Sequence, residues 1–137
     1  MAIKAVVFDC YGVLYNDGIG AYNQPLLAIV RALRAHYRTG VLSNMSGAGL
    51  RARIQQGKMA DAFDAVVASG DTNSMKPHRE IFEYIAAELG VSLPEILFFD
   101  DSVDHVQGAQ AHGIQAVHYR SLQDVTDALD AHHLNYL

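Results

Sequence analysis

The chain has 137 residues, of which 50% are hydrophobic and 18% charged, and its formal net charge is −5. These proportions exclude a disordered chain and favour a compact domain, which we expect to span residues 1–137 as one unit. The sequence has no apolar run long enough for a membrane span, no secretory signal pattern and no basic cluster, so we expect neither membrane nor nucleic-acid partners. Its single cysteine, Cys10, allows no internal disulfide and favours a cytoplasmic location.

Short β-branched runs alternate along the chain with segments of helical period. The runs predict strands at residues 3–8, 39–43, 64–68, 96–99 and 115–118. This alternation is typical of an α/β fold, here a three-layer αβα sandwich built on a Rossmann-like parallel sheet of about five strands.

Amphipathic segments between these strands predict the helices. In the first, Leu26, Val30, Leu33 and Tyr37 recur at helical spacing behind a cap at Asn23. Four further helices are predicted: over residues 48–56, from after 77 to a stop at Gly90, over 102–112, and from 121 to about 133. Ser121 and Asp124 form a start similar to a capping box.

Four polar clusters follow four of the predicted strands. Because the carboxyl ends of parallel strands meet at one edge of a sheet, we expect these clusters to converge in one crevice. They are Asp9 with Tyr11, Ser43 with Asn44, Lys76 with Pro77, and Asp100 with Asp101.

Taken singly, each cluster has a simpler interpretation. A lone aspartate after a strand is usually a turn residue, Ser43 and Asn44 would also suit a helix cap, and a lone lysine is usually solvated. The adjacent Asp100 and Asp101 are different, because two like charges at a buried strand end are unfavourable without a cation. This pair therefore indicates a metal site.

The order, types and surroundings of the four clusters resemble the haloacid dehalogenase superfamily. The resemblance covers nearly the whole chain. Besides the first strand it includes Val41-Leu42-Ser43-Asn44, Ser74-Met75-Lys76-Pro77, Leu97-Phe98-Phe99-Asp100-Asp101-Ser102 and Gly108-Ala109-Gln110-Ala111-His112-Gly113.

The resemblance implies a role for each cluster. Asp9 is expected to attack a phosphorylated substrate and form a covalent aspartyl intermediate, Ser43 and Asn44 to bind the phosphoryl group, and Lys76 to offset negative charge. Asp9, the main-chain carbonyl of Tyr11, Asp101 and Asp100 are expected to hold Mg²⁺, a cation that prefers oxygen ligands. Whether Asp100 or Asp101 contacts the ion directly stays open.

Tyr11 stands where phosphatases of this superfamily carry a second aspartate as general acid and base. A tyrosine, with a reference pKa near 10, is a poor base at neutral pH, and losing such a group slows a reaction by about two to four orders of magnitude. The sequence therefore predicts a slow, Mg²⁺-dependent, phosphatase-like hydrolase. The alternative is a catalytically silent domain that binds a phosphorylated ligand or a protein.

The Asp-x-Tyr-Gly pattern of the first cluster is also similar to that of the 2-haloacid dehalogenases, which gives a third hypothesis. The acidic pair at Asp100 and Asp101 argues against it, because those enzymes work without metal. They also carry a helical cap, and the residues between Leu14 and Val41 leave no room for one beside the first helix. We therefore expect a capless chain, whose open site suits large substrates or is covered by a second subunit in a homo-oligomer.

We expect ordinary roles for three further residues near these clusters. Cys10 is expected to pack in the core and His78 to be exposed at the start of its helix. His105 is expected to lie partly exposed on its helix, and the alternative is that it approaches the site from the first turn of that helix. The short loop after Leu14, which contains Gly18 and Gly20, is read as an ordinary connection.

Overall fold

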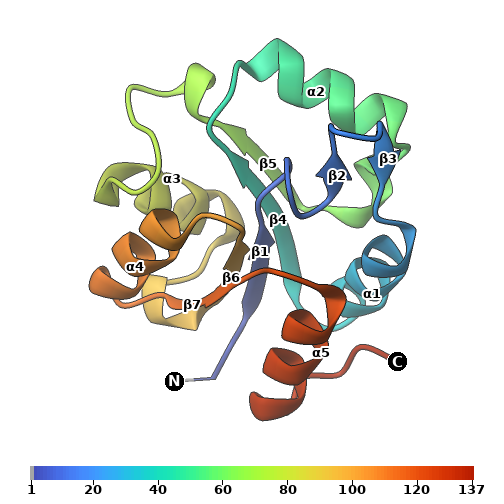
Figure 1. Cartoon of the computed structure of the whole chain (residues 1–137). Helices are drawn as coiled ribbons and strands as arrows, with labels where there is room; N and C mark the ends of the chain where they lie inside the picture. Colours follow the sequence, from blue (N-terminus) through green and yellow to red (C-terminus); the bar gives the residue numbers. More distant parts are fainter. Residues whose placement is uncertain (1) are drawn as a thin grey trace.

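The protein, seen in a computed structural model that describes residues 2–137, is built on a five-stranded parallel sheet (Figure 1). The sheet order is β5-β4-β1-β6-β7, and every neighbouring pair is parallel. The strands are β1 (Ala5–Phe8), β4 (Arg38–Ser43), β5 (Ala65–Ala68), β6 (Ile96–Asp100) and β7 (Gln115–His118). The predicted α/β sandwich is therefore confirmed.

Helices cover both faces of the sheet (Figure 1). One face carries α1 (Gln24–Arg34), α2 (Gly47–Gln56) and α5 (Leu122–Ala131), and the other carries α3 (Arg79–Leu89) and α4 (Val103–Ala111). Short 3-10 turns lie at Ala60–Ala62, Ser69–Asp71 and Leu93–Glu95. None of the helices in residues 2–137 is long and apolar enough to cross a membrane.

The hydrophobic core is divided by the sheet into two clusters, because successive strand side chains point to opposite faces. In β1, Val6 and Phe8 pack with α1, α2 and α5, whereas Ala5 and Val7 pack with α3 and α4. Since both faces of β1 are covered, its whole run is apolar, and this places β1 at the centre of the sheet.

Local signals at the helix ends act as expected. The side chain of Asn23 accepts a hydrogen bond from the backbone N–H of Leu26 at 3.2 Å. Gly90 ends α3 in the left-handed region with φ of +70°, and Ser121 with Asp124 forms a capping box at the start of α5.

The structure differs from the sequence-based expectation in two places. Helix α1 ends at Arg34, so Tyr37 lies in the turn before β4, where its backbone N–H still bonds to the carbonyl of Leu33. The segment after Leu14 is a β-hairpin of β2 (Tyr15–Asn16) and β3 (Ala21–Tyr22) rather than a simple connection. Each of these strands has two residues, too few to show an alternating pattern.

The sheet topology determines where polar side chains gather. Phe8 of β1 is paired with Val41 of β4 on one side and with Phe99 of β6 on the other. The chain leaves β1 at Asp9, whose backbone N–H donates to the carbonyl of Phe99 at 3.0 Å. Between β1 and β4 the chain forms only the hairpin and α1, without a cap domain.

Candidate active site

Lys76 lies at the centre of the polar cluster at the carboxyl edge of the sheet. Its ammonium nitrogen is 2.9 Å from Oδ1 of Asp9, 2.7 Å from Oδ2 of Asp100 and 2.9 Å from the carbonyl oxygen of Leu42. An ammonium group has three hydrogens to donate, so each is used. Because only 1% of the side chain is exposed, these bonds replace hydration of the charge.

The carboxylate of Asp9 is held at one oxygen and open at the other. Oδ1 accepts hydrogen bonds from Lys76 and from the backbone N–H of Cys10, the latter at 2.9 Å, whereas no hydrogen bond within residues 2–137 reaches Oδ2. Burial, with the nearby charge of Asp100 adding to it and Lys76 opposing it, raises the pKa of Asp9 to about 7. The ionised form of Asp9 thus depends on nearby positive charge.

Asp100 is fully buried and accepts hydrogen bonds from three groups. Oδ2 faces Lys76 and, at 3.1 Å, Nδ1 of His105, while Oδ1 accepts the backbone N–H of Ser102 at 2.9 Å. Burial alone would raise the pKa of Asp100, but Lys76, the N–H of Ser102 and His105 together outweigh burial and hold this pKa below its usual value. His105 is thus partly exposed, as expected, and its ring also reaches the site.

Asn44 and Ser43 come from the end of β4. The side-chain amide of Asn44 donates to the carbonyl of Lys76 at 3.0 Å and accepts the backbone N–H of Lys76 at 2.9 Å. Ser43 is buried beside them. Neither caps the next helix, because Ser46 does so through Gly49. The phosphoryl contacts predicted for Ser43 and Asn44 stay predictions.

Asp101 is exposed and closes the cluster on the solvent side. One oxygen from each of Asp9, Asp100 and Asp101 lies within 4.8 Å of the others. These carboxylates outnumber the single ammonium of Lys76, and oxygen ligands with excess negative charge suit a divalent cation such as Mg²⁺. The residues present therefore fit the metal site that the sequence suggests.

Gly12 permits this position of Asp101. It has φ of +83°, and a Cβ atom on it would collide with the carboxylate of Asp101. The turn after Asp9 thus requires glycine both for its backbone conformation and for the close approach of the Asp101 side chain.

Tyr11 belongs to a group of tyrosines beside the site. Its ring lies 5.4 Å from that of Tyr15, which is 4.6 Å from that of Tyr22. The guanidinium of Arg53 stacks over Tyr15 at 4.9 Å. Tyr15 and Tyr22 face each other across the β2–β3 hairpin. This hairpin, which the sequence did not predict, therefore borders the site.

Two residues near the cluster have the expected ordinary roles. Cys10 is fully buried in the hydrophobic core, and burial raises the pKa of its thiol to about 12, so the thiol is not a nucleophile at neutral pH. His78 is exposed at the start of α3.

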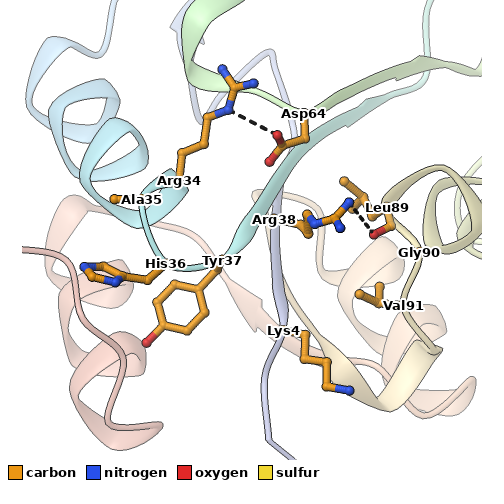
Figure 2. Close-up of a pocket in the computed structure, with 10 residues that line it drawn as sticks. All are labelled: Lys4, Arg34, Ala35, His36, Tyr37, Arg38, Asp64, Leu89, Gly90 and Val91. Carbon is orange, nitrogen blue, oxygen red and sulfur yellow. Dashed lines mark hydrogen bonds and ion pairs between the residues drawn. The ribbon is translucent and has the colours of Figure 1, made fainter.

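A separate pocket of about 400 Å³ lies at the amino edge of the sheet, away from Asp9 (Figure 2). Figure 2 shows Arg34 bonded to Asp64, and Arg38 bonded to the carbonyl of Leu89. Arg34 and Leu89 lie in the last turns of α1 and α3, where cations are favoured by the helix dipole. We therefore assign this pocket's positive charge to the stability of the fold.

Comparison with known proteins gives a consistent assignment. The family model of haloacid dehalogenase-like hydrolases matches residues 24–113. A phosphatase of Mycobacterium tuberculosis is 37% identical over 90 residues, which are 65% of this chain and 42% of that protein. An (S)-2-haloacid dehalogenase of Xanthobacter autotrophicus is 31% identical over 101 residues, 71% of this chain and 40% of that protein. The chain thus spans about two fifths of these relatives.

Solved structures share the fold over nearly their full length. An uncharacterized protein from Corynebacterium glutamicum has a TM-score of 0.82 at 24% identity, with 98% of each chain covered. A haloacid dehalogenase family enzyme from Bacteroides thetaiotaomicron, in complex with magnesium and inorganic phosphate, has a TM-score of 0.75 at 18% identity, covering 87% of this chain and 95% of that one. Because the family match covers well over half of the sequence, the chain belongs to the haloacid dehalogenase-like hydrolases.

Proposed function

We propose that this chain is an Mg²⁺-dependent, phosphatase-like hydrolase that acts on a phosphate monoester through Asp9. The observation that carries the proposal is the asymmetry of the Asp9 carboxylate. Lys76 and the N–H of Cys10 fix Oδ1, and Oδ2 is left for a substrate. Once positive charge holds it in the ionised form, a carboxylate fixed in this way can attack with little rearrangement.

The first step transfers the phosphoryl group. Oδ2 of Asp9 attacks phosphorus, a bond forms between them, and the ester P–O bond breaks with its electron pair on the leaving oxygen. Ser43 donates a hydrogen bond to a phosphoryl oxygen. A leaving group with a low pKa departs as an anion, whereas a poor one must take a proton as it leaves.

The second step releases the product. Water attacks phosphorus of the aspartyl phosphate, the bond from phosphorus to Asp9 breaks, and inorganic phosphate leaves while the carboxylate is restored. The attacking water must lose a proton, and Tyr11 is a poor acceptor for it at neutral pH. We therefore expect this step to limit turnover.

The acidic cluster supplies the ligands for the metal. We assign Asp9, Asp101 and the main-chain carbonyl of Tyr11 as direct ligands, and Asp100 as a ligand through water, because the carboxylate of Asp100 is fully buried whereas that of Asp101 is exposed. Bound Mg²⁺ would neutralise charge on the phosphoryl group and on Asp9. The phosphatase relative and the magnesium and phosphate complex of a structural neighbour support this assignment.

The surroundings of the site suggest how it is used. Without a cap domain in the described chain, the carboxyl edge is open, which suits a large phosphorylated substrate or cover by another subunit. We propose a cytoplasmic enzyme whose partners are such substrates rather than nucleic acid or membranes.

One panel of substrates tests the proposal. Phosphate monoesters with good and poor leaving groups, and 2-haloacids, are assayed with and without Mg²⁺ on wild type, Asp9→Asn and Asp127→Asn. Asp127 is an exposed aspartate of α5, so its variant is a matched carboxylate-to-amide control. We expect Mg²⁺-dependent release of phosphate that Asp9→Asn abolishes and Asp127→Asn leaves unchanged.

The same panel separates the two alternatives. Metal-independent halide release would make the chain a dehalogenase, the hypothesis that Tyr11 and the Xanthobacter relative favour. If no ester or haloacid is turned over by correctly folded wild type, the chain is a silent binding domain.

A further inference from the structure

A cavity of about 410 Å³ lies between the β2–β3 hairpin and the segment after β7. Its lining is mostly aromatic and aliphatic. The aromatic and aliphatic residues are Val13, Tyr15, Ile19, Ala21, Tyr22 and Tyr119, and Gly12, Asn16 and Asn23 complete this part of the lining. Arg120 also lines it, but its guanidinium is paired with Asp124 at 3.3 Å.

The cavity adjoins the proposed active site. Gly12 lines it, and the same residue lies against the carboxylate of Asp101. On the other side, the backbone N–H of Tyr119 donates to the carbonyl of Asp100 at 2.8 Å. The cavity therefore begins where the acidic cluster ends, and a molecule with its phosphate near Asp9 could extend into it.

The walls of the cavity are fixed to each other. The amide of Asn23 donates to the carbonyl of Val13 at 3.1 Å and to the hydroxyl of Tyr119 at 2.9 Å. These bonds join the hairpin base to the segment after β7, which lies about a hundred residues further along the chain, and so keep the cavity open without a ligand.

Ile19, at the hairpin turn, adds to the apolar lining of the cavity. Ile19 is 75% exposed and lines the cavity, so its apolar surface is available to a ligand there. A ligand that enters the cavity would cover Ile19, and burying this apolar surface would favour binding.

We infer that this cavity receives the organic group of the phosphate monoester, and that this group is aromatic or otherwise apolar. The inference rests on the proposed function for its phosphate end. The cavity volume falls within the range of about 300–1,000 Å³ that small-molecule sites occupy. Specificity that cap domains provide elsewhere would here come from the hairpin.

The test measures binding rather than turnover. Titration calorimetry compares benzylphosphonate with methylphosphonate in the presence of Mg²⁺ on wild type, Ile19→Asp and Leu137→Asp. Leu137 is fully exposed and outside the cavity lining, so its variant makes the same kind of change elsewhere. We expect benzylphosphonate to bind wild type about tenfold more tightly, since burying an aromatic ring is favourable.

We expect Ile19→Asp to reduce this ratio at least about threefold, and Leu137→Asp to leave it unchanged. Equal affinities, equal effects of the two variants, or no binding of either phosphonate would overturn the inference. If esters are hydrolysed through Asp9 but the ratio is one, only this inference fails. If the ratio is as expected but no ester is hydrolysed, the proposed function fails and the cavity remains a binding site.

Discussion

The side chain of Asn44 clamps the backbone of Lys76, donating to its carbonyl at 3.0 Å and accepting its N–H at 2.9 Å. This pair of bonds sets the start of the lysine side chain, whose ammonium reaches Asp9. We therefore expect Asn44→Ala to lower kcat at least about tenfold and to destabilise the fold by about 1–3 kcal/mol. Steady-state kinetics and urea unfolding measure the two effects.

The sequence suggested that Asn44 contacts the substrate instead, and the same variant separates the two roles. A positioning residue affects kcat through Lys76. An increase in KM with kcat unchanged would assign Asn44 to substrate binding and contradict the positioning role.

Gly12→Ala tests the approach of Asp101 to the turn after Asp9. Gly12 and Gly90 both have positive φ, at +83° and +70°, so alanine at either position costs about 1–2 kcal/mol in backbone strain. Only at Gly12 would the new Cβ meet a carboxylate, since nothing lies within 4 Å of it at Gly90. Thermal unfolding should show a similar loss of stability for both variants. Titration of activity with Mg²⁺ should show a weaker apparent affinity for Mg²⁺ only in Gly12→Ala. Equal Mg²⁺ responses would refute this role of Gly12.

Tyr11→Asp tests the missing acid and base. An aspartate at this position can protonate the leaving oxygen and accept the proton of water, so turnover of an ester with a poor leaving group should rise at least about tenfold. Tyr11→Asn is the matched control, because asparagine is similar in size to aspartate and has no carboxylate. If Tyr11→Asp binds Mg²⁺ and is folded but is no faster than Tyr11→Asn, proton transfer is not what limits this enzyme.

Glu95 gives the fold a pH dependence far from the site. Its hydrogen bonds with Lys4 and with Ser92 lower the pKa of Glu95 from 4.5 to about 2. A carboxyl with a lowered pKa in the folded state adds stability above its unfolded value of 4.5, and this contribution is lost as the pH falls through about 2. Urea unfolding between these pH values should show that the free energy of unfolding falls less with decreasing pH in Glu95→Gln than in wild type. Glu88 is exposed, and Glu88→Gln should lose as much stability as wild type over this range. Identical slopes of unfolding free energy against pH for all three proteins would exclude this effect.

Much of the fold could be predicted because its signals are local. Strands β1 and β5 are continuous apolar runs and β6 is one up to Asp100, and the caps at Asn23 and Gly90 depend on residues a few positions away. The hairpin could not be predicted in the same way, because strands of two residues carry no period and are stabilised by the packing of Tyr15 against Tyr22.

The clusters of the candidate site were predicted from their places after strands, but their internal contacts were not. Asn44 and Lys76 are 32 positions apart, and nothing in either segment specifies that the amide faces the backbone. The contact of His105 with Asp100 likewise depends on how α4 leaves β6, which tertiary packing decides. The same holds for the cavity beside Gly12, whose walls come from both ends of the chain.

The most direct measurement of the central claim is rapid-quench kinetics with p-nitrophenyl phosphate and Mg²⁺. This leaving group departs without a proton, so the first step should be fast, while the second lacks a base. We predict a burst of p-nitrophenol close to one equivalent per protein, together with a phosphorylated Asp9 detected by mass spectrometry, and both should be absent in Asp9→Asn. Phosphate ester turnover that persists in Asp9→Asn would contradict the account.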